Sequence, residues 1–206
     1  GCQAMQHGLR AVLVLGCAVA TCATAHDAPS RPGIDAPELA HLGQYSVGVR
    51  TVWFVQRDQV DVLAFDPETG TAPKHDRRFQ AEFWYPAEVP AGESPATYSG
   101  SFPSEPPAPP AQFTIPGIAV RNAQMIGGRF PLVIVSHGYS NADVAMSWLG
   151  ENLASKGYIV AAIRHDDPPI TDRSKFPQLL LRRPLDIAFV SDATGARCEH
   201  MEQGLV

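Results

Sequence analysis

The chain has 206 residues, of which 45% are hydrophobic and 18% are charged, a balance typical of a globular domain and not of a disordered segment. Its formal net charge is -5 at pH 7, and lysine and arginine form no continuous stripe. The composition therefore argues against a nucleic-acid partner. We expect one domain with a sizeable apolar core.

Residues 1–25 have the organisation of a secretory signal peptide. We expect translation to start at Met5. Arg10 supplies a positive charge, residues 9–20 are mainly apolar, and Ala23-Thr24-Ala25 is a small-x-small cleavage site. The apolar run is shorter than the roughly 20 residues of a membrane-spanning helix. We therefore expect this segment to be removed and the mature chain to be secreted or periplasmic, with no stable membrane span.

The cysteines leave a second interpretation of the amino terminus open. Val14-Leu15-Gly16 precedes Cys17, which permits a lipoprotein signal in place of cleavage after Ala25. Only Cys198 follows the predicted signal peptide, so the mature chain cannot form an internal disulfide. We interpret Cys198 as incidental, because residues 195–200 show no strand-turn-helix pattern around a nucleophile.

Two alternating segments early in the mature chain predict β-strands. Residues 44–55 and residues 78–85 both alternate apolar and polar side chains, and the second segment ends at Pro86. Such alternation is typical of a strand with one buried face. We expect the two strands to form an antiparallel pair at the edge of a sheet.

Residues 86–116 are predicted to form a proline-rich loop, which includes Pro106-Pro107-Ala108-Pro109-Pro110. The segment has few large apolar residues and many fixed φ angles, so a surface excursion of polyproline character is expected. A rim or lid over a site is the alternative, because long loops without structure are uncommon inside compact domains.

A parallel βαβ unit is predicted in the middle of the chain. Residues 130–136 form an apolar run without polar alternation, which is typical of a strand buried on both faces. Ser140 or Asn141 is expected to cap the following helix, and Gly157 to end it. Residues 158–163 then form the next strand, joined by a right-handed crossover.

A last helix is predicted to open at Arg183-Pro184-Leu185-Asp186. Proline is favoured at the first helical position, which Pro184 would occupy. Asp186 would then lie in the first turn, where the helix dipole favours a carboxylate. Residues 192–206 show no strand pattern.

These segments, in this order, resemble the amino-terminal half of an α/β-hydrolase, in the branch of dienelactone hydrolases and platelet-activating-factor acetylhydrolase-like esterases. The resemblance implies an α/β fold: a three-layer sandwich with antiparallel edge strands followed by a parallel βαβ unit. It also implies that residues 26–206 are an incomplete domain, and that the activity needs no cofactor. The segments that carry it are Gln44–Gly48, Glu82–Ala87, Pro131–Gly138, Leu153–Tyr158 and Arg183–Asp186.

The resemblance assigns an oxyanion hole to the loop that follows residues 130–136. By position, the backbone N–H of Tyr139 would stabilise the charged oxygen of a tetrahedral intermediate, and Gly138 would keep the turn tight. The alternative is that Gly138 only ends the strand. His137 is interpreted as structural, because the family's catalytic base lies near the end of the chain.

No metal site is expected. His165, Asp166 and Asp167 are consecutive, and adjacent residues rarely converge on one ion. The resemblance also implies no metal, so the sequence predicts neither a metal ion nor a cofactor.

The family's nucleophile is not found in the sequence. No serine has the flanking glycines of Gly-x-Ser-x-Gly, which places the nucleophile on a strained strand-to-helix turn. The resemblance implies that nucleophile, acid and histidine lie beyond Val206. Residues 132–135 would then form a flat strand with one unpaired edge, which favours poor solubility.

We therefore expect an exported serine hydrolase of carboxylic esters or lactones, present here as a fragment and inactive alone. Its partner would be a small-molecule ester, and phospholipid acetyl esters, dienelactones and short carboxylic esters all stay open. The alternative is a secreted, non-catalytic binding module on a degenerate hydrolase scaffold. The oligomeric state is not predicted.

Overall fold

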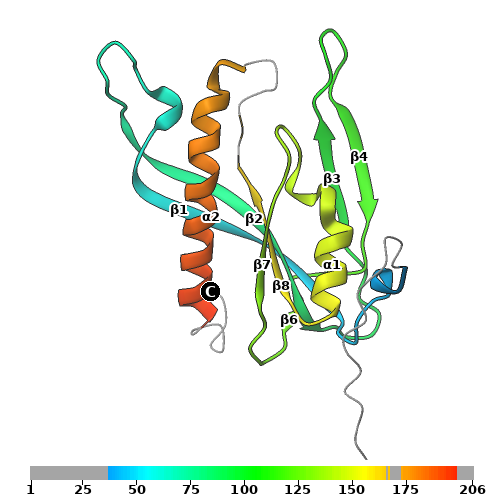
Figure 1. Ribbon diagram of the computed structural model, residues 1–206. Helices are drawn as coiled ribbons and strands as arrows, with labels where there is room; N and C mark the ends of the chain where they lie inside the picture. The colour runs from blue at the N-terminus through cyan, green and yellow to red at the C-terminus, as the bar shows by residue number, and fades with distance from the viewer. Residues whose placement is uncertain (1–36, 166, 168–172, 199–206) are drawn as a thin grey trace, which may run out of the picture. The chain divides into compact units, whose positions relative to one another are not determined.

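The structure is a computed structural model that describes residues 37–165, 167 and 173–198 (Figure 1). The predicted signal peptide, Cys17 and Asp166 lie outside the described residues. All described residues belong to one compact unit, which begins at Pro37. Within them, no helix is long and apolar enough to cross a membrane.

Strands and helices alternate in the second half of the described chain, after an antiparallel first half. In chain order the elements are η1 (Pro37–Ala40), β1 (Val47–Val60), η2 (Val62–Ala64), β2 (Lys74–Glu88), β3 (Thr97–Phe102), β4 (Ala111–Pro116), β5 (Val120–Arg121), β6 (Gln124–Met125), β7 (Leu132–Ser136), η3 (Asp143–Met146), α1 (Ser147–Ser155), β8 (Ile159–Arg164), η4 (Arg173–Lys175) and α2 (Phe176–Cys198).

The main sheet has the strand order β5-β1-β2-β8-β7, and β6 pairs with β2 beside this path. β1 and β2 are antiparallel, with Val47 opposite Pro86, which confirms the predicted pair. β7 and β8 are parallel, with Leu132 opposite Ile159, which confirms the predicted βαβ unit. β2 also pairs with β8, so the antiparallel and parallel parts form one mixed sheet, and β7 is its last strand.

The helices α1 and α2 cover opposite faces of this sheet (Figure 1). Because side chains alternate across a strand, Ala161 and Ile163 of β8 point to one face, where they pack with Val190 of α2. Val160 and Ala162 point to the other face, where they pack with α1. Helix, sheet and helix therefore form three layers, as predicted for the α/β fold.

The prediction of a loop over residues 86–116 is wrong in part. β2 continues to Glu88, and β3 and β4 form an antiparallel two-stranded sheet in which Tyr98 lies opposite Ile115. Tyr98 is buried and packs edge-on against Trp84 of the main sheet. The high proline content hid these strands, because the proline cluster lies between them and not within them.

The last helix is present, but its predicted start is wrong. α2 begins at Phe176, so Pro184 lies inside the helix and Asp186 is not in its first turn. An internal proline removes one helical hydrogen bond. Packing explains why the helix continues, because Val190 and Asp186 are both buried on the side that faces the sheet.

The predicted cap before α1 is not formed. Ala142 precedes η3 without a side-chain cap, and the Asn141 Oδ1 atom accepts from the backbone N–H of Ala142 instead. Ser140 lies farther upstream. The predicted end is close to the one observed: Gly157 follows α1 with φ of +94°, a conformation in which glycine is favoured.

Two helical glycines make a matched pair of substitutions. A Cβ atom on Gly150 would lie 2.5 Å from the indole of buried Trp84, whereas a Cβ on Gly195 would meet nothing within 4 Å. We expect Gly150→Ala to destabilise the fold by about 1–3 kcal/mol through overpacking. Gly195→Ala should stabilise it by about 0.5–1 kcal/mol. Urea unfolding of both variants tests this, and equal effects would contradict the packing described.

Candidate functional site at the carboxyl ends of β7 and β8

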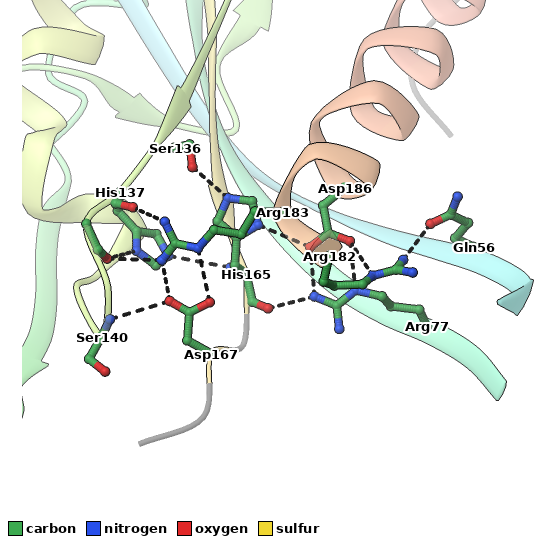
Figure 2. Close-up of polar contacts among 11 residues, drawn as sticks. Gln56, Arg77, Ser136, His137, Ser140, His165, Asp167, Arg182, Arg183 and Asp186 are labelled. Carbon is green, nitrogen blue, oxygen red and sulfur yellow. Dashed lines mark hydrogen bonds and ion pairs between the residues drawn. The ribbon is translucent and has the colours of Figure 1, made fainter. Parts of the chain in front are cut away.

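The carboxyl ends of the two parallel strands bring polar residues together (Figure 2). Ser136 ends β7, and His165 directly follows β8. α2 contributes Asp186 from its middle. Because parallel strands end at the same edge of a sheet, this edge is where open α/β sheets bind their ligands.

Ser136, His165 and Asp186 form a hydrogen-bonded chain. The Ser136 Oγ and His165 Nε2 atoms lie 2.9 Å apart, and the His165 Nδ1 and Asp186 Oδ2 atoms lie 3.1 Å apart. An ionised Asp186 can only accept, so Nδ1 carries the proton and Nε2 accepts from the serine hydroxyl. This is the order of groups in a serine-hydrolase triad.

Two arginines compete with His165 for the same carboxylate. The Arg77 Nε and Nη2 atoms donate to Asp186 at 2.7 and 2.8 Å, and the Arg182 Nε atom donates at 3.0 Å. Burial acts to raise the pKa of Asp186, but the hydrogen bonds from His165 and Arg77 and the two guanidinium charges together lower it. Asp186 is therefore a buried anion whose charge is already shared.

A second ion pair holds the loop after β7, residues 137–141. Arg183 pairs with Asp167 and donates to the backbone oxygens of His137 and Gly138. Asp167 also accepts from the backbone N–H of Ser140 at 3.4 Å. Through Arg183, α2 thus fixes the backbone of this loop.

The adjoining cavity is too small for a substrate. It has a volume of about 10 Å³ and is lined by His165, Asp167 and the three arginines, among others, which is about the space of one water molecule. The Ser136–His165–Asp186 chain thus connects β7, β8 and α2 through buried hydrogen bonds.

Ser140 has the backbone conformation of a nucleophile, which differs from the feature found at Ser136. It follows Gly138-Tyr139 on a strand-to-helix connection, and its φ of +53° is unusual for a residue other than glycine. Its Oγ atom is buried and has no hydrogen-bond partner among the described residues. A nucleophile elbow needs a left-handed backbone and a histidine partner on one residue. Ser136 has the histidine partner, and Ser140 has the left-handed backbone.

The predicted oxyanion residues lie in the loop after β7. Gly138 follows the strand end, and its O atom accepts from the N–H of Asn141 at 3.1 Å. A Cβ on Gly138 would meet only one atom, at 4.0 Å, so the space around it does not demand glycine. The ring of Tyr139 packs edge-on against Phe176. The oxyanion role of Gly138 and Tyr139 stays a prediction.

His137 lies where its predicted structural role requires. It is buried, its Nδ1 atom donates to the O atom of Gly138 at 2.7 Å, and its Nε2 atom accepts from the backbone N–H of His165. Burial lowers its pKa below the ordinary value. His137 is therefore a neutral group that is fully used in hydrogen bonds to the backbone.

The two described residues of the His165-Asp166-Asp167 segment, for which no metal site is predicted, are held by other protein groups. Both ring nitrogens of His165 are hydrogen-bonded, and Asp167 pairs with Arg183. Within the described part of the chain, no three histidine, cysteine, aspartate or glutamate side chains gather in a metal-binding arrangement.

Comparison with known proteins gives one family match. Residues 112–175 match the family model of platelet-activating factor acetylhydrolase, isoform II, a segment that contains β7, its loop, α1 and β8. A solved ferulic acid esterase from Streptomyces cinnamoneus is similar at 24% identity and a TM-score of 0.41, over 59% of this chain and 34% of that chain. The chain thus spans about a third of that structure. None of the curated proteins compared with the chain matches it.

Proposed function

We propose that this chain, which is related to the α/β-hydrolase family through residues 112–175, is the amino-terminal part of an exported serine hydrolase of carboxylic esters or lactones. The family match carries the proposal, because it covers the unit in which β7 delivers Gly138 and Tyr139 to the carboxyl edge of the sheet. A small-molecule ester would bind at this edge.

In this proposal, the chain supplies the backbone group that stabilises the charged oxygen of the reaction intermediate. When a nucleophile attacks an ester carbonyl, the carbonyl oxygen becomes an anion that a fixed N–H can stabilise. The N–H of Tyr139 is assigned this role. Arg183 supports this role, because its guanidinium group donates to the backbone oxygens of His137 and Gly138 and so fixes the loop.

The nucleophile is proposed to be a serine of the complete enzyme that lies beyond Val206. That serine would attack the ester carbon while a histidine takes its proton and passes it to the departing alcohol; water then releases the acid. The support is geometric, because neither Ser136 nor Ser140 combines a left-handed backbone with a histidine partner. No cofactor takes part.

An esterase assay tests the proposal directly. We expect the purified chain to hydrolyse p-nitrophenyl acetate no faster than buffer, and a fluorophosphonate probe to leave it unlabelled. Ser136→Ala and Ser140→Ala are the matched controls, and both should give the same blank rate. Turnover that Ser136→Ala or Ser140→Ala abolishes would place the nucleophile inside this chain and overturn the assignment.

The coding sequence after Val206 and the mature amino terminus provide two further tests. A Gly-x-Ser-x-Gly segment in a continuing or shifted frame would support the hydrolase. A genuine stop, with a soluble and inactive product that melts cooperatively, would favour a non-catalytic binding module. Mass spectrometry of the exported product is expected to show cleavage after Ala25, and a lipidated Cys17 would contradict this.

A further inference from the structure

A polar pocket lies on the face of the sheet that α1 covers, away from the network of Asp186. Its volume is about 180 Å³, which is below the range of drug-sized sites and suits a small ligand. Glu82 of β2 and Arg164 of β8 line it from the sheet. Tyr98 of β3, Arg121 of β5 and Asp143 of η3 line it from the surrounding elements. We call it the Asp143 pocket.

Asp143 is the feature of this pocket that the fold leaves unexplained. The residue is 4% exposed. Its Oδ1 atom accepts from the backbone N–H of Val144 at 3.1 Å, whereas its Oδ2 atom has no hydrogen-bond partner among the described residues. A buried carboxylate oxygen without a donor destabilises a fold by a few kcal/mol. That oxygen is buried, so a ligand donor would reach it by a turn of the carboxylate toward the pocket, and the new bond would remove the penalty.

The remaining charges of the pocket identify the ligand class. Glu82 is paired with Arg121 and also accepts from the Thr51 hydroxyl at 2.8 Å. Arg164 has no acidic side chain within ion-pairing distance in the part of the chain described, and it faces the same pocket as Asp143. A buried anion that lacks a donor and a solvent-exposed cation that lacks an acidic partner among the described residues therefore line a common space.

We propose that the Asp143 pocket binds a small zwitterion, with an ammonium group donating to the Oδ2 atom of Asp143 and an anionic group accepting from the guanidinium of Arg164. A ligand with one charge would match only one of the two groups. A fully apolar ligand would leave the buried oxygen of Asp143 without a donor. The proposal goes beyond ester hydrolysis, and it does not depend on the oxyanion assignment of Tyr139.

Isothermal titration calorimetry of the full chain tests this with glycine, 4-aminobutyrate and 6-aminohexanoate, whose charges lie at different separations. We expect one of them to bind at least about tenfold more tightly than butylamine or butyrate. Asp143→Asn and Arg164→Gln should each weaken that binding by about tenfold or more, as loss of a charge-assisted hydrogen bond predicts. A thermal shift on adding the ligand gives a second readout.

Charge-matched substitutions at exposed positions outside the pocket serve as controls. Glu93→Gln removes one negative charge and Arg129→Gln removes one positive charge, as the two pocket substitutions do. Both control variants should leave the affinity for the zwitterion unchanged. If Asp143→Asn fails to fold, Arg164→Gln alone decides, because Arg164 is exposed. No detectable binding of any of the three zwitterions at about 10 mM would overturn the proposal, and so would equal affinity of both pocket variants and wild type. Ester turnover is not a readout, so its absence leaves this test unaffected.

Discussion

Asp186→Ala is expected to destabilise the folded chain by about 3–5 kcal/mol, the usual effect of removing one partner from a buried ion pair. The substitution would leave the guanidinium groups of Arg77 and Arg182 without their carboxylate, and both side chains are less than 10% exposed. The Nδ1 atom of His165 would lose its acceptor in the same step. Urea unfolding followed by circular dichroism measures the change.

An exposed ion pair provides the matched control. Asp76 pairs with Arg57 at 3.6 Å, and the two side chains are 43% and 83% exposed. Asp76→Ala should therefore change the free energy of unfolding by less than about 1 kcal/mol. If Asp186→Ala has no larger effect than this control, the buried network does not stabilise the fold in the way described.

The pH dependence of unfolding gives a second check on Asp186. Its folded-state pKa is lowered from the ordinary value of 3.8. The stability that it contributes is therefore complete above that value and is lost as the pH falls through the lower folded pKa. Asp186→Asn should remove this part of the acid dependence, while the control Asp76→Asn should keep it. Parallel acid profiles for Asp186→Asn and wild type would contradict the lowered pKa.

The sheet could be predicted because its signals are local in the sequence. Alternation in residues 44–55 and 78–85 marks strands with one buried face, and the unbroken apolar run of residues 130–136 marks a strand that helices cover on both sides. The resulting β1–β2 pair and β7–α1–β8 unit are both present. Each of these signals lies within about ten residues, where periodicity is informative.

The site could be predicted only in part, because its contacts are distant in sequence. Arg77 and Asp186 are separated by 109 residues, so no spacing rule connects them. Pro184 misled the prediction of α2, because proline marks the start of many helices and is tolerated inside this one by packing. One signal was available in the predicted parallel pair of strands. Ser136 ends the first strand and His165 follows the second, which places both residues at the same edge of the sheet.

Glu151→Ala is the second substitution with a large expected effect. Glu151 lies in α1 and is 6% exposed, and its Oε1 atom accepts from three donors: the Tyr98 hydroxyl at 2.7 Å and the backbone N–H groups of Ile118 and Ala119 at 2.8 and 2.9 Å. Trp84 donates to the Tyr98 oxygen at 2.8 Å. One carboxylate oxygen therefore joins α1 to β2, to β3 and to the segment before β5.

Alanine at position 151 would leave three donors without an acceptor, and each unsatisfied group destabilises a fold by about 1–3 kcal/mol. We therefore expect a loss of about 3 kcal/mol or more in urea unfolding. Glu151→Gln keeps a carbonyl oxygen that can accept the same bonds, and it should lose markedly less. Because Tyr98 also lines the Asp143 pocket, Glu151→Ala should weaken zwitterion binding while Glu151→Gln preserves it. Equal stability of the two variants would show that Glu151 does not organise this face of the sheet.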